Sequence, residues 1–198
     1  MRPVAFIGDI HGGHDLLRQM LDEPRLMDRE LVFLGDYVNR GPQSRAVVQH
    51  LIQLRDTHPR STTFLRGNHD AAFNEVLQGS RAAAFLLMGG SATVRSWVPE
   101  VVGDVGQAVR ASATAEEVEF FATLSGSWSR DGVLAVHSRP ADLETLEDVA
   151  LLIVGHHQQD DASPRIVNGC AYLDTGCGSR PDGRLSALLL PEREFISN

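Results

Sequence analysis

Gly35-Asp36-Tyr37-Val38-Asn39-Arg40-Gly41-Pro42 is the stretch around which the rest of the chain is organised. It follows an apolar run at residues 31–34, which is typical of a buried strand in an α/β unit, and a helical pattern follows from residue 44 to about residue 55. The stretch therefore lies where a parallel strand ends, which is where open α/β sheets bind their ligands. In one cleft, Asp36 offers a carboxylate to a metal ion and Arg40 offers a guanidinium to phosphate oxygens.

The same design occurs before and after this stretch. The apolar run at residues 4–7 leads to Asp9 and His11 in a glycine-rich turn, and the run at residues 62–65 leads to Gly67-Asn68-His69-Asp70. Three strand ends near the start of the chain thus each supply a glycine turn and metal-compatible side chains. Because unrelated surface loops would not repeat this arrangement, we expect the three loops to converge on one site.

The last third of the chain returns to short apolar runs. Residues 133–136 lead directly to His137, and residues 151–154 lead through Gly155 to His156. Both histidines therefore also stand at predicted strand ends. Three further strands are predicted at residues 166–168, 171–174 and 185–190.

The segment at residues 79–130 has a different pattern and is predicted to be a helical insertion beside the sheets. Helical patterns cover residues 82–88 and 115–124, and Thr114 is a suitable N-cap for the second of these. We expect Trp97 and Trp128 within this segment to serve in core packing.

Composition limits the classes of protein to consider. The 198 residues are 42% hydrophobic and 22% charged, which is ordinary for one soluble domain spanning residues 1–198. The net charge of −8 argues against a long nucleic acid as partner. No apolar stretch reaches the roughly 20 residues of a membrane span, and the first residues lack the features of a signal peptide. Two cysteines suit a reducing compartment, so we expect a cytoplasmic protein.

Five motifs, in order, resemble those of the calcineurin-like metallophosphoesterases, and the likeness spans nearly the whole chain. The motifs are Gly8-Asp9-Ile10-His11-Gly12, the stretch at residues 35–42, Gly67-Asn68-His69-Asp70, Val136-His137 and Gly155-His156. The likeness is closest to the phosphoprotein phosphatase branch, which includes bacterial diadenosine tetraphosphatases. Residues 89–97 also resemble a segment of the bacterial members. The resemblance implies an α/β fold in which two mixed sheets pack face to face in a four-layer α/β/β/α sandwich.

The resemblance also implies a centre with two divalent transition metal ions. One ion would be held by Asp9, His11 and Asp36, and the second by Asp36, Asn68, His137 and His156. Such a centre activates water as a hydroxide and neutralises the charge of the phosphate, without a covalent intermediate. Manganese is the first expectation for this mixed oxygen and nitrogen ligand set, with iron or zinc as alternatives.

Three further residues match the family in its phosphate chemistry. His69 would protonate the leaving-group oxygen, and Arg40 and Arg66 would bind phosphate, Arg66 as the weaker candidate. A third phosphate-binding arginine of the family has Arg139 as its only candidate here.

Asn39 departs from the family, which usually has an aspartate at this position to pair with the histidine matched by His69. An amide supplies no negative charge, so we expect a lower pKa for His69 and a loss within the ~10²–10⁴-fold range of general acid–base catalysis. Substrates with good leaving groups should be affected least.

The function expected from these features is hydrolysis of phosphate monoesters by a metal-bound hydroxide. A bacterial serine/threonine protein phosphatase-like enzyme, acting on phosphorylated proteins, peptides or small esters, is the first candidate. A dinucleoside polyphosphate (diadenosine tetraphosphate) hydrolase is the second. The alternative of another class is a phosphate-binding module that has lost turnover, for which Asn39 is the only support in the sequence. The sequence leaves the oligomeric state open.

Overall fold

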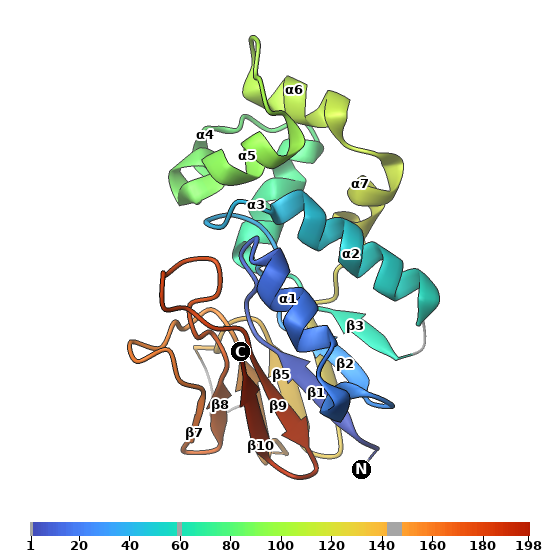
Figure 1. Cartoon of the computed structure of the whole chain (residues 1–198), viewed down its shortest axis with the longest axis vertical. Helices are drawn as coiled ribbons and strands as arrows, with labels where there is room; N and C mark the ends of the chain where they lie inside the picture. The colour runs from blue at the N-terminus through green and yellow to red at the C-terminus, as the bar shows by residue number, and fades with distance from the viewer. Residues whose placement is uncertain (1, 59–60, 142–147) are drawn as a thin grey trace.

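Two five-stranded mixed sheets form the body of the protein, as seen in a computed structural model that describes residues 2–58, 61–141 and 148–198 (Figure 1). The strand order is β10-β9-β1-β2-β3 in the first sheet and β4-β5-β6-β8-β7 in the second. The strands of the first sheet are β1 (Val4–Ile7), β2 (Glu30–Phe33), β3 (Thr62–Phe64), β9 (Ser186–Leu190) and β10 (Glu194–Ser197). Those of the second are β4 (Ser127–Arg130), β5 (Val133–Val136), β6 (Leu151–Val154), β7 (Arg165–Val167) and β8 (Cys170–Tyr172).

The apolar runs of the sequence are continuous because both faces of the first sheet are covered. In β1, Val4 and Phe6 pack into the layer between the two sheets, whereas Ala5 and Ile7 pack against the helices. β1, β2 and β3 run parallel, and β9 pairs antiparallel with β1. In the second sheet β5, β6 and β8 run parallel, with an antiparallel strand at each edge.

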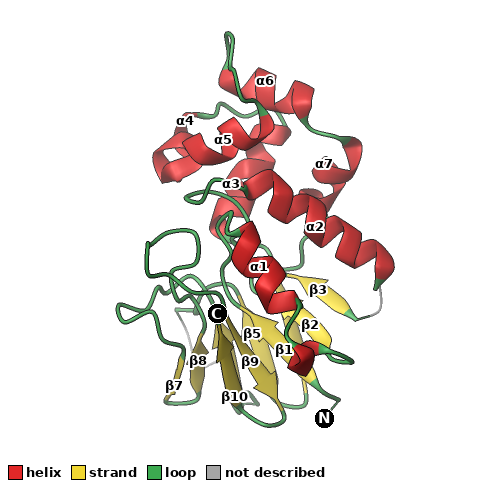
Figure 2. Ribbon diagram, in the orientation of Figure 1, coloured by secondary structure: helices red, strands yellow, loops and turns green. Residues whose placement is uncertain are grey.

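The helices pack on the outer face of the first sheet, and several of them extend beyond the sheet to form one end of the molecule (Figure 2). α1 and α2 lie beside β1, β2 and β3, while α3 to α7 gather at the end opposite the N-terminus (Figure 1). The helices are α1 (His14–Leu21), η1 (Pro24–Leu26), α2 (Ser44–Thr57), α3 (Asn68–Leu77), α4 (Ala83–Phe85), η2 (Leu86–Gly90), α5 (Ser91–Trp97), α6 (Val105–Ser112) and α7 (Ala115–Ala122).

The expected architecture, two mixed sheets packed face to face with helices outside, is confirmed. The predicted C-terminal bound of the helical insertion, residue 130, is wrong. Residues 127–130 form β4, an edge strand of the second sheet, so Trp128 lies in a strand and not in the insertion. Its ring packs edge-on against Phe6, with centroids 5.0 Å apart, and its indole N–H donates to Glu30. Helices α5 and α6 and strand β10 were not predicted from the sequence.

The carboxyl ends of the parallel strands of both sheets point toward the end of the molecule that holds α3 to α7 (Figure 1). The loops that follow β1, β2, β3, β5 and β6 therefore meet at one edge of the sandwich. No helix within the described residues has the length and apolar character needed to cross a membrane.

Candidate active site

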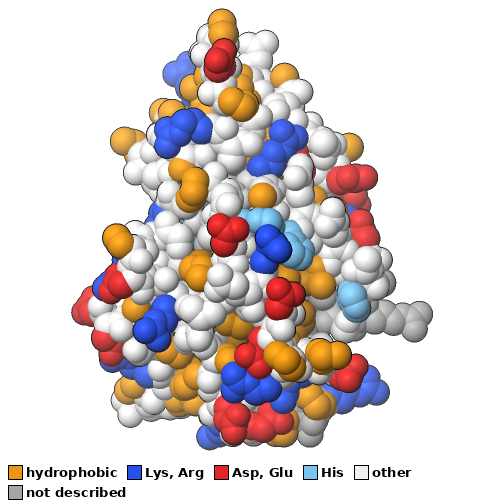
Figure 3. Space-filling model, in the orientation of Figure 1, with side chains coloured by type: hydrophobic (Ala, Val, Ile, Leu, Met, Phe, Trp, Pro, Cys, Tyr) orange, Lys and Arg blue, Asp and Glu red, His pale blue; other side chains and the backbone are white. Residues whose placement is uncertain are grey.

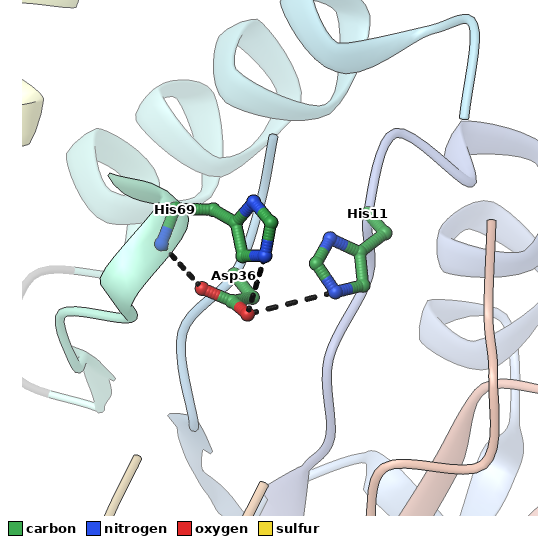
Figure 4. A group of neighbouring side chains, drawn as sticks. All are labelled: His11, Asp36 and His69. Atoms are coloured by element: carbon green, nitrogen blue, oxygen red, sulfur yellow. Dashed lines mark hydrogen bonds and ion pairs between the residues drawn. The ribbon is translucent and has the colours of Figure 1, made fainter. Parts of the chain in front are cut away.

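Asp36 lies at the centre of the cluster formed where these loops meet. Its carboxylate Oδ2 lies 3.5 Å from His11 Nε2, 3.4 Å from His137 Nε2 and 3.9 Å from His69 Nε2. Oδ1 accepts a hydrogen bond from the backbone N–H of His69, at 3.0 Å. Figure 4 shows the rings of His11 and His69 on two sides of this carboxylate, each with Nε2 directed toward it.

The loops reach this arrangement through strained backbone and tightly packed glycines. Asp36 has a φ of 55° and His156 a φ of 57°, in the left-handed region that non-glycine residues rarely adopt. A Cβ on Gly67 would collide with the Asp36 carboxylate, and one on Gly155 would collide with that of Asp9. The Gly–Asn–His and Gly–His motifs are therefore needed because a neighbouring carboxylate occupies the space of a side chain. Backbone strain of this kind concentrates at functional sites.

His11 shows most directly that the cluster suits a cation. Its Nδ1 donates to the carbonyl of Val38 at 2.9 Å, so Nε2 is the free nitrogen of the neutral ring. Among the described residues Nε2 has no hydrogen-bond partner, and it is buried 3.5 Å from Asp36 Oδ2 and 4.0 Å from Asp9 Oδ2. Burial lowers the pKa of His11 to about 3, so the ring is neutral near pH 7 and presents a lone pair toward two carboxylates. A buried polar atom without a partner is rare, and a metal ion would satisfy it.

A second group of ligand-type side chains lies on the other side of Asp36. His137 Nε2 lies 3.1 Å from Asn68 Oδ1, and His156 Nδ1 lies 2.8 Å from the same oxygen. The Nδ1 of His137 donates to the carbonyl of Leu34 at 2.9 Å, which fixes the ring with Nε2 toward the cluster. Two sets of side chains, His11–Asp36–His69 and Asp36–His137–His156, are each compact enough to hold a metal ion.

Asp9 lies in the loop after β1, between His11 of the first group and His156 of the second. Its carboxylate accepts the backbone N–H of His156, with distances of 3.2 and 3.1 Å to the two oxygens. Burial raises the pKa of Asp9 well above its usual range, and the nearby carboxylate of Asp174 adds to this. Buried carboxylates that repel one another are stabilised by a bound cation.

The charges of Asp36 and His137 stabilise each other and offset the cost of burying them. Burial opposes ionisation of Asp36, but the hydrogen bond and charge of His137 hold its pKa below the usual range. Burial likewise lowers the pKa of His137, yet its hydrogen bond to Asp36 prevails and raises that pKa to about 10. The pair therefore favours a positive charge beside Asp36, and a metal ion would supply one.

Asp70 is a functional residue that the sequence motif contains but for which no role was predicted. Its carboxylate accepts the backbone N–H groups of Asp36 (2.7 Å), Tyr37 (2.9 Å) and Gly67 (2.9 Å). It is fully buried, and burial raises its pKa to about 7. Asp70 therefore holds the two loops that carry Asp36 and Asn68 in register. The only indication of this role in the sequence is that Asp70 lies two residues after Asn68, a predicted metal ligand.

Substituting Asp70 by Asn is expected to destabilise the protein and to lower its activity. An amide keeps one acceptor oxygen but turns an N–H group toward a backbone N–H, which leaves a buried donor without a partner. The free energy of unfolding should fall by about 1–3 kcal/mol, or roughly 2–4 °C in melting temperature for each kcal/mol. Thermal unfolding at pH 8 measures the effect. Asp131→Asn, in an exposed turn, is the control, and equal melting temperatures for the two variants would contradict this role.

Asn39 contacts His69 as the sequence predicts. Its side-chain Nδ2 lies 2.7 Å from His69 Nδ1, and both residues are buried. The pKa of His69 is lowered, chiefly by burial, while the charge of Asp36 opposes this effect. The direction agrees with the expectation from the sequence, but the cause is desolvation, which no carboxylate at position 39 offsets.

The three predicted phosphate-binding arginines occupy different places. Arg40 is exposed at the rim beside the cluster, and its charge lowers the pKa values of His11 and His69. Arg66 is also exposed, and its backbone N–H donates to Ser125, whereas its side chain forms no hydrogen bond or ion pair with the cluster residues described above. Arg139 Nη1 lies 3.4 Å from the hydroxyl of Tyr172, on the side of the second sheet. The structure thus brings Arg40 to the site and directs Arg139 elsewhere.

Comparisons with known proteins agree with this geometry. The sequence model of the calcineurin-like phosphoesterase family matches residues 2–160. A solved structure of a candidate diadenosine tetraphosphatase is 22% identical, with a TM-score of 0.59 over 99% of this chain and 92% of that one. A cold-active protein-tyrosine phosphatase from the psychrophile Shewanella sp. is 16% identical, with a TM-score of 0.65 over 95% of this chain and 75% of that one.

A protein serine/threonine phosphatase from Saccharomyces cerevisiae also shares the fold. It is 12% identical, with a TM-score of 0.59 over 99% of this chain and 78% of that one. These three proteins carry names that refer to different substrates, and at such identities they support the fold alone. The family match rests on the ordered motifs and on most of the chain. The protein therefore belongs to the calcineurin-like phosphoesterase family and is a metal-dependent hydrolase of phosphate esters.

Proposed function

We propose that the site holds two divalent ions that share Asp36, and that residues 1–198 act as one phosphoesterase domain. The observation that carries this proposal is the buried Nε2 of His11, which faces Asp36 and Asp9 and has no hydrogen-bond partner in the part of the chain that the structure describes. The first ion would be held by Asp9, His11 and Asp36. The second would be held by Asp36 together with Asn68, His137 and His156, whose ligand atoms lie within hydrogen-bond distance of one another.

Such ions, when bound, supply an activated water and charge neutralisation for phosphate. The chain's own residues do the rest. Arg40, at the rim, is placed to bind phosphate oxygens through its guanidinium. His69 is placed to direct its Nε2 toward the leaving-group oxygen, on the same side as Asp36. We propose that water attacks phosphorus directly, without a covalent intermediate.

For the substrate, we propose first a phosphate monoester, as in a serine/threonine protein phosphatase-like enzyme with activity on small esters. Arg, Asp and Glu side chains are interspersed on the face drawn in Figure 3, which fits a peptide or small ester better than a long nucleic acid. Manganese is the proposed metal and the cytoplasm the proposed location.

A dinucleoside polyphosphate is the second candidate, and Asn39 favours it. The leaving group of a phosphoanhydride is weakly basic and depends little on protonation by His69, whose partner here is an amide. The solved structure of the candidate diadenosine tetraphosphatase is consistent with this alternative.

The test is hydrolysis of p-nitrophenyl phosphate by metal-stripped protein before and after manganese is added. We expect no turnover without metal, and restoration by manganese at two ions per chain. A phosphoserine peptide and diadenosine tetraphosphate, compared by kcat/KM in the same buffer, then separate the two candidates. Two bound ions without turnover on any of the three substrates would instead favour the phosphate-binding module.

A further inference from the structure

Thr93 connects the helical segment to the candidate active site. It lies in α5, is fully buried, and directs its hydroxyl at Asn39, the partner of His69. The same segment reaches Asn39 at a second point, because the carbonyl of Met88 in η2 lies 3.4 Å from Asn39 Nδ2. Two adjacent helical turns of the insertion thus enclose the side chain of Asn39.

The hydrogen bonds around Thr93 determine which end of the Asn39 amide faces which neighbour. The Thr93 hydroxyl oxygen accepts the backbone N–H of Asn39 at 2.8 Å, and its single hydrogen is donated to Asn39 Oδ1 at 3.0 Å. Ser44 Oγ lies 3.0 Å from the same oxygen and completes its contacts as a donor. The amide nitrogen is then left to face His69 Nδ1 at 2.7 Å.

The reversed amide fits the same surroundings poorly. Asn39 Oδ1 would then face the carbonyl oxygen of Met88 at the 3.4 Å that now separates Nδ2 from it, and the two oxygens would repel each other. The oxygen and nitrogen of an asparagine side chain are distinguished by such contacts. Thr93 and Met88 therefore favour the same orientation, from opposite sides of the amide.

We propose that Thr93 is a positioning residue: by fixing the orientation of the Asn39 amide it makes His69 Nδ1 an acceptor, so that the ring proton lies on Nε2. Nε2 is the nitrogen that faces Asp36, 3.9 Å from its Oδ2, where the substrate's leaving group would lie. Thr93 acts through Asn39 and touches neither His69 nor substrate. The neutral ring, with its proton on Nε2, would act at the leaving-group oxygen as a hydrogen-bond donor that stabilises the developing negative charge, and it would keep this proton. This inference rests on the proposed place of His69 at the leaving group.

The test compares Thr93→Val, which keeps the shape of the side chain and removes the hydroxyl, with Thr93→Ser, which keeps the hydroxyl. With p-nitrophenyl phosphate and manganese, we expect Thr93→Val to lower kcat about tenfold, with KM changed less than about twofold, because the ring is less well oriented. Thr93→Ser should restore most of the rate. Thr114→Val, which removes the N-cap of α7, is the control for loss of stability in the helical segment and should leave kcat unchanged.

Two readouts separate positioning from a merely structural role. In an Asn39→Asp background the two oxygens are equivalent, so Thr93→Val should cost much less of kcat than in the wild type. In the zinc-loaded protein, the ¹⁵N NMR signals of His69 should show a proton on Nε2 in the wild type and a mixture of both tautomers in Thr93→Val.

Equal losses in both backgrounds, or a wild-type His69 with its proton on Nδ1, would overturn the inference. Failure of the proposed function is distinguishable from this, because it would appear as absent metal-dependent turnover in the wild type. The NMR measurement of the tautomer does not depend on turnover.

Discussion

Replacing Asp36 by Asn is expected to reduce manganese-dependent hydrolysis of p-nitrophenyl phosphate by about 10³-fold or more, since the substitution removes the charge that both metal groups share. The amide oxygen can still accept the N–H of His69, so the fold should be kept. The other end of the amide would turn an N–H group toward the Nε2 atoms of His11 and His137, which now lie 3.5 and 3.4 Å from a carboxylate oxygen. Metal content per chain should fall together with kcat.

Asp28→Asn is the matched control for this variant. Asp28 also has a left-handed backbone, with a φ of 62°, but it is exposed in a turn away from the cluster. The same chemical change there should leave kcat and the number of bound ions unchanged. If Asp36→Asn retained two ions and most of its turnover, the shared-carboxylate centre would be wrong.

Replacing Asn39 by Asp is expected to raise kcat for alkyl phosphates by about 10²-fold, while p-nitrophenyl phosphate gains less than about tenfold. A carboxylate at this position accepts a hydrogen bond from Nδ1–H of His69 and stabilises the charged ring, which can then protonate a basic leaving group. The contact already exists at 2.7 Å, so no rearrangement of the loop is required. A phosphoserine peptide and p-nitrophenyl phosphate, assayed with the same enzyme preparations, provide the two leaving groups.

The comparison between substrates is the essential part of this experiment. An equal gain with both would indicate an effect on metal binding or stability, which metal content and melting temperature would reveal. No gain with either substrate would show that His69 does not protonate the leaving group in this protein. In that case the departure at position 39 would carry no meaning for substrate choice.

Much of the site could be predicted because its residues follow apolar strands in a regular way. Residues 4–7, 133–136 and 151–154 are strands with the predicted bounds. The two-residue spacing of Asp9 and His11 is a feature of local sequence and requires only that parallel strands end at a common edge. The contact of Asn39 with His69, which are 30 positions apart, was expected from the resemblance to the family.

Other features depend on residues that are distant in the sequence. Thr93 meets Asn39 across 54 positions. Although residues 89–97 resemble a segment of the bacterial family members, nothing in that segment indicates that Thr93 contacts Asn39. The sequence placed Trp128 in the helical insertion, whereas the structure places it in β4, which pairs with β5. Arg139 stands two residues after His137, yet its side chain turns to Tyr172, because a residue's direction at a strand end depends on the loop that follows.

The sequence by itself determined the family of folds, the edge of the sheets at which the site lies and the chemical types of its ligands, since these follow from hydrophobic periodicity and from motifs at strand ends. Only the tertiary structure decided that His11 Nε2 is buried with no partner among the described residues, that Asp70 accepts hydrogen bonds from two loops and that Thr93 contacts Asn39. The physical reason is that hydrogen-bond partners and burial belong to pairs of atoms brought together by folding, and no single segment of the chain contains them.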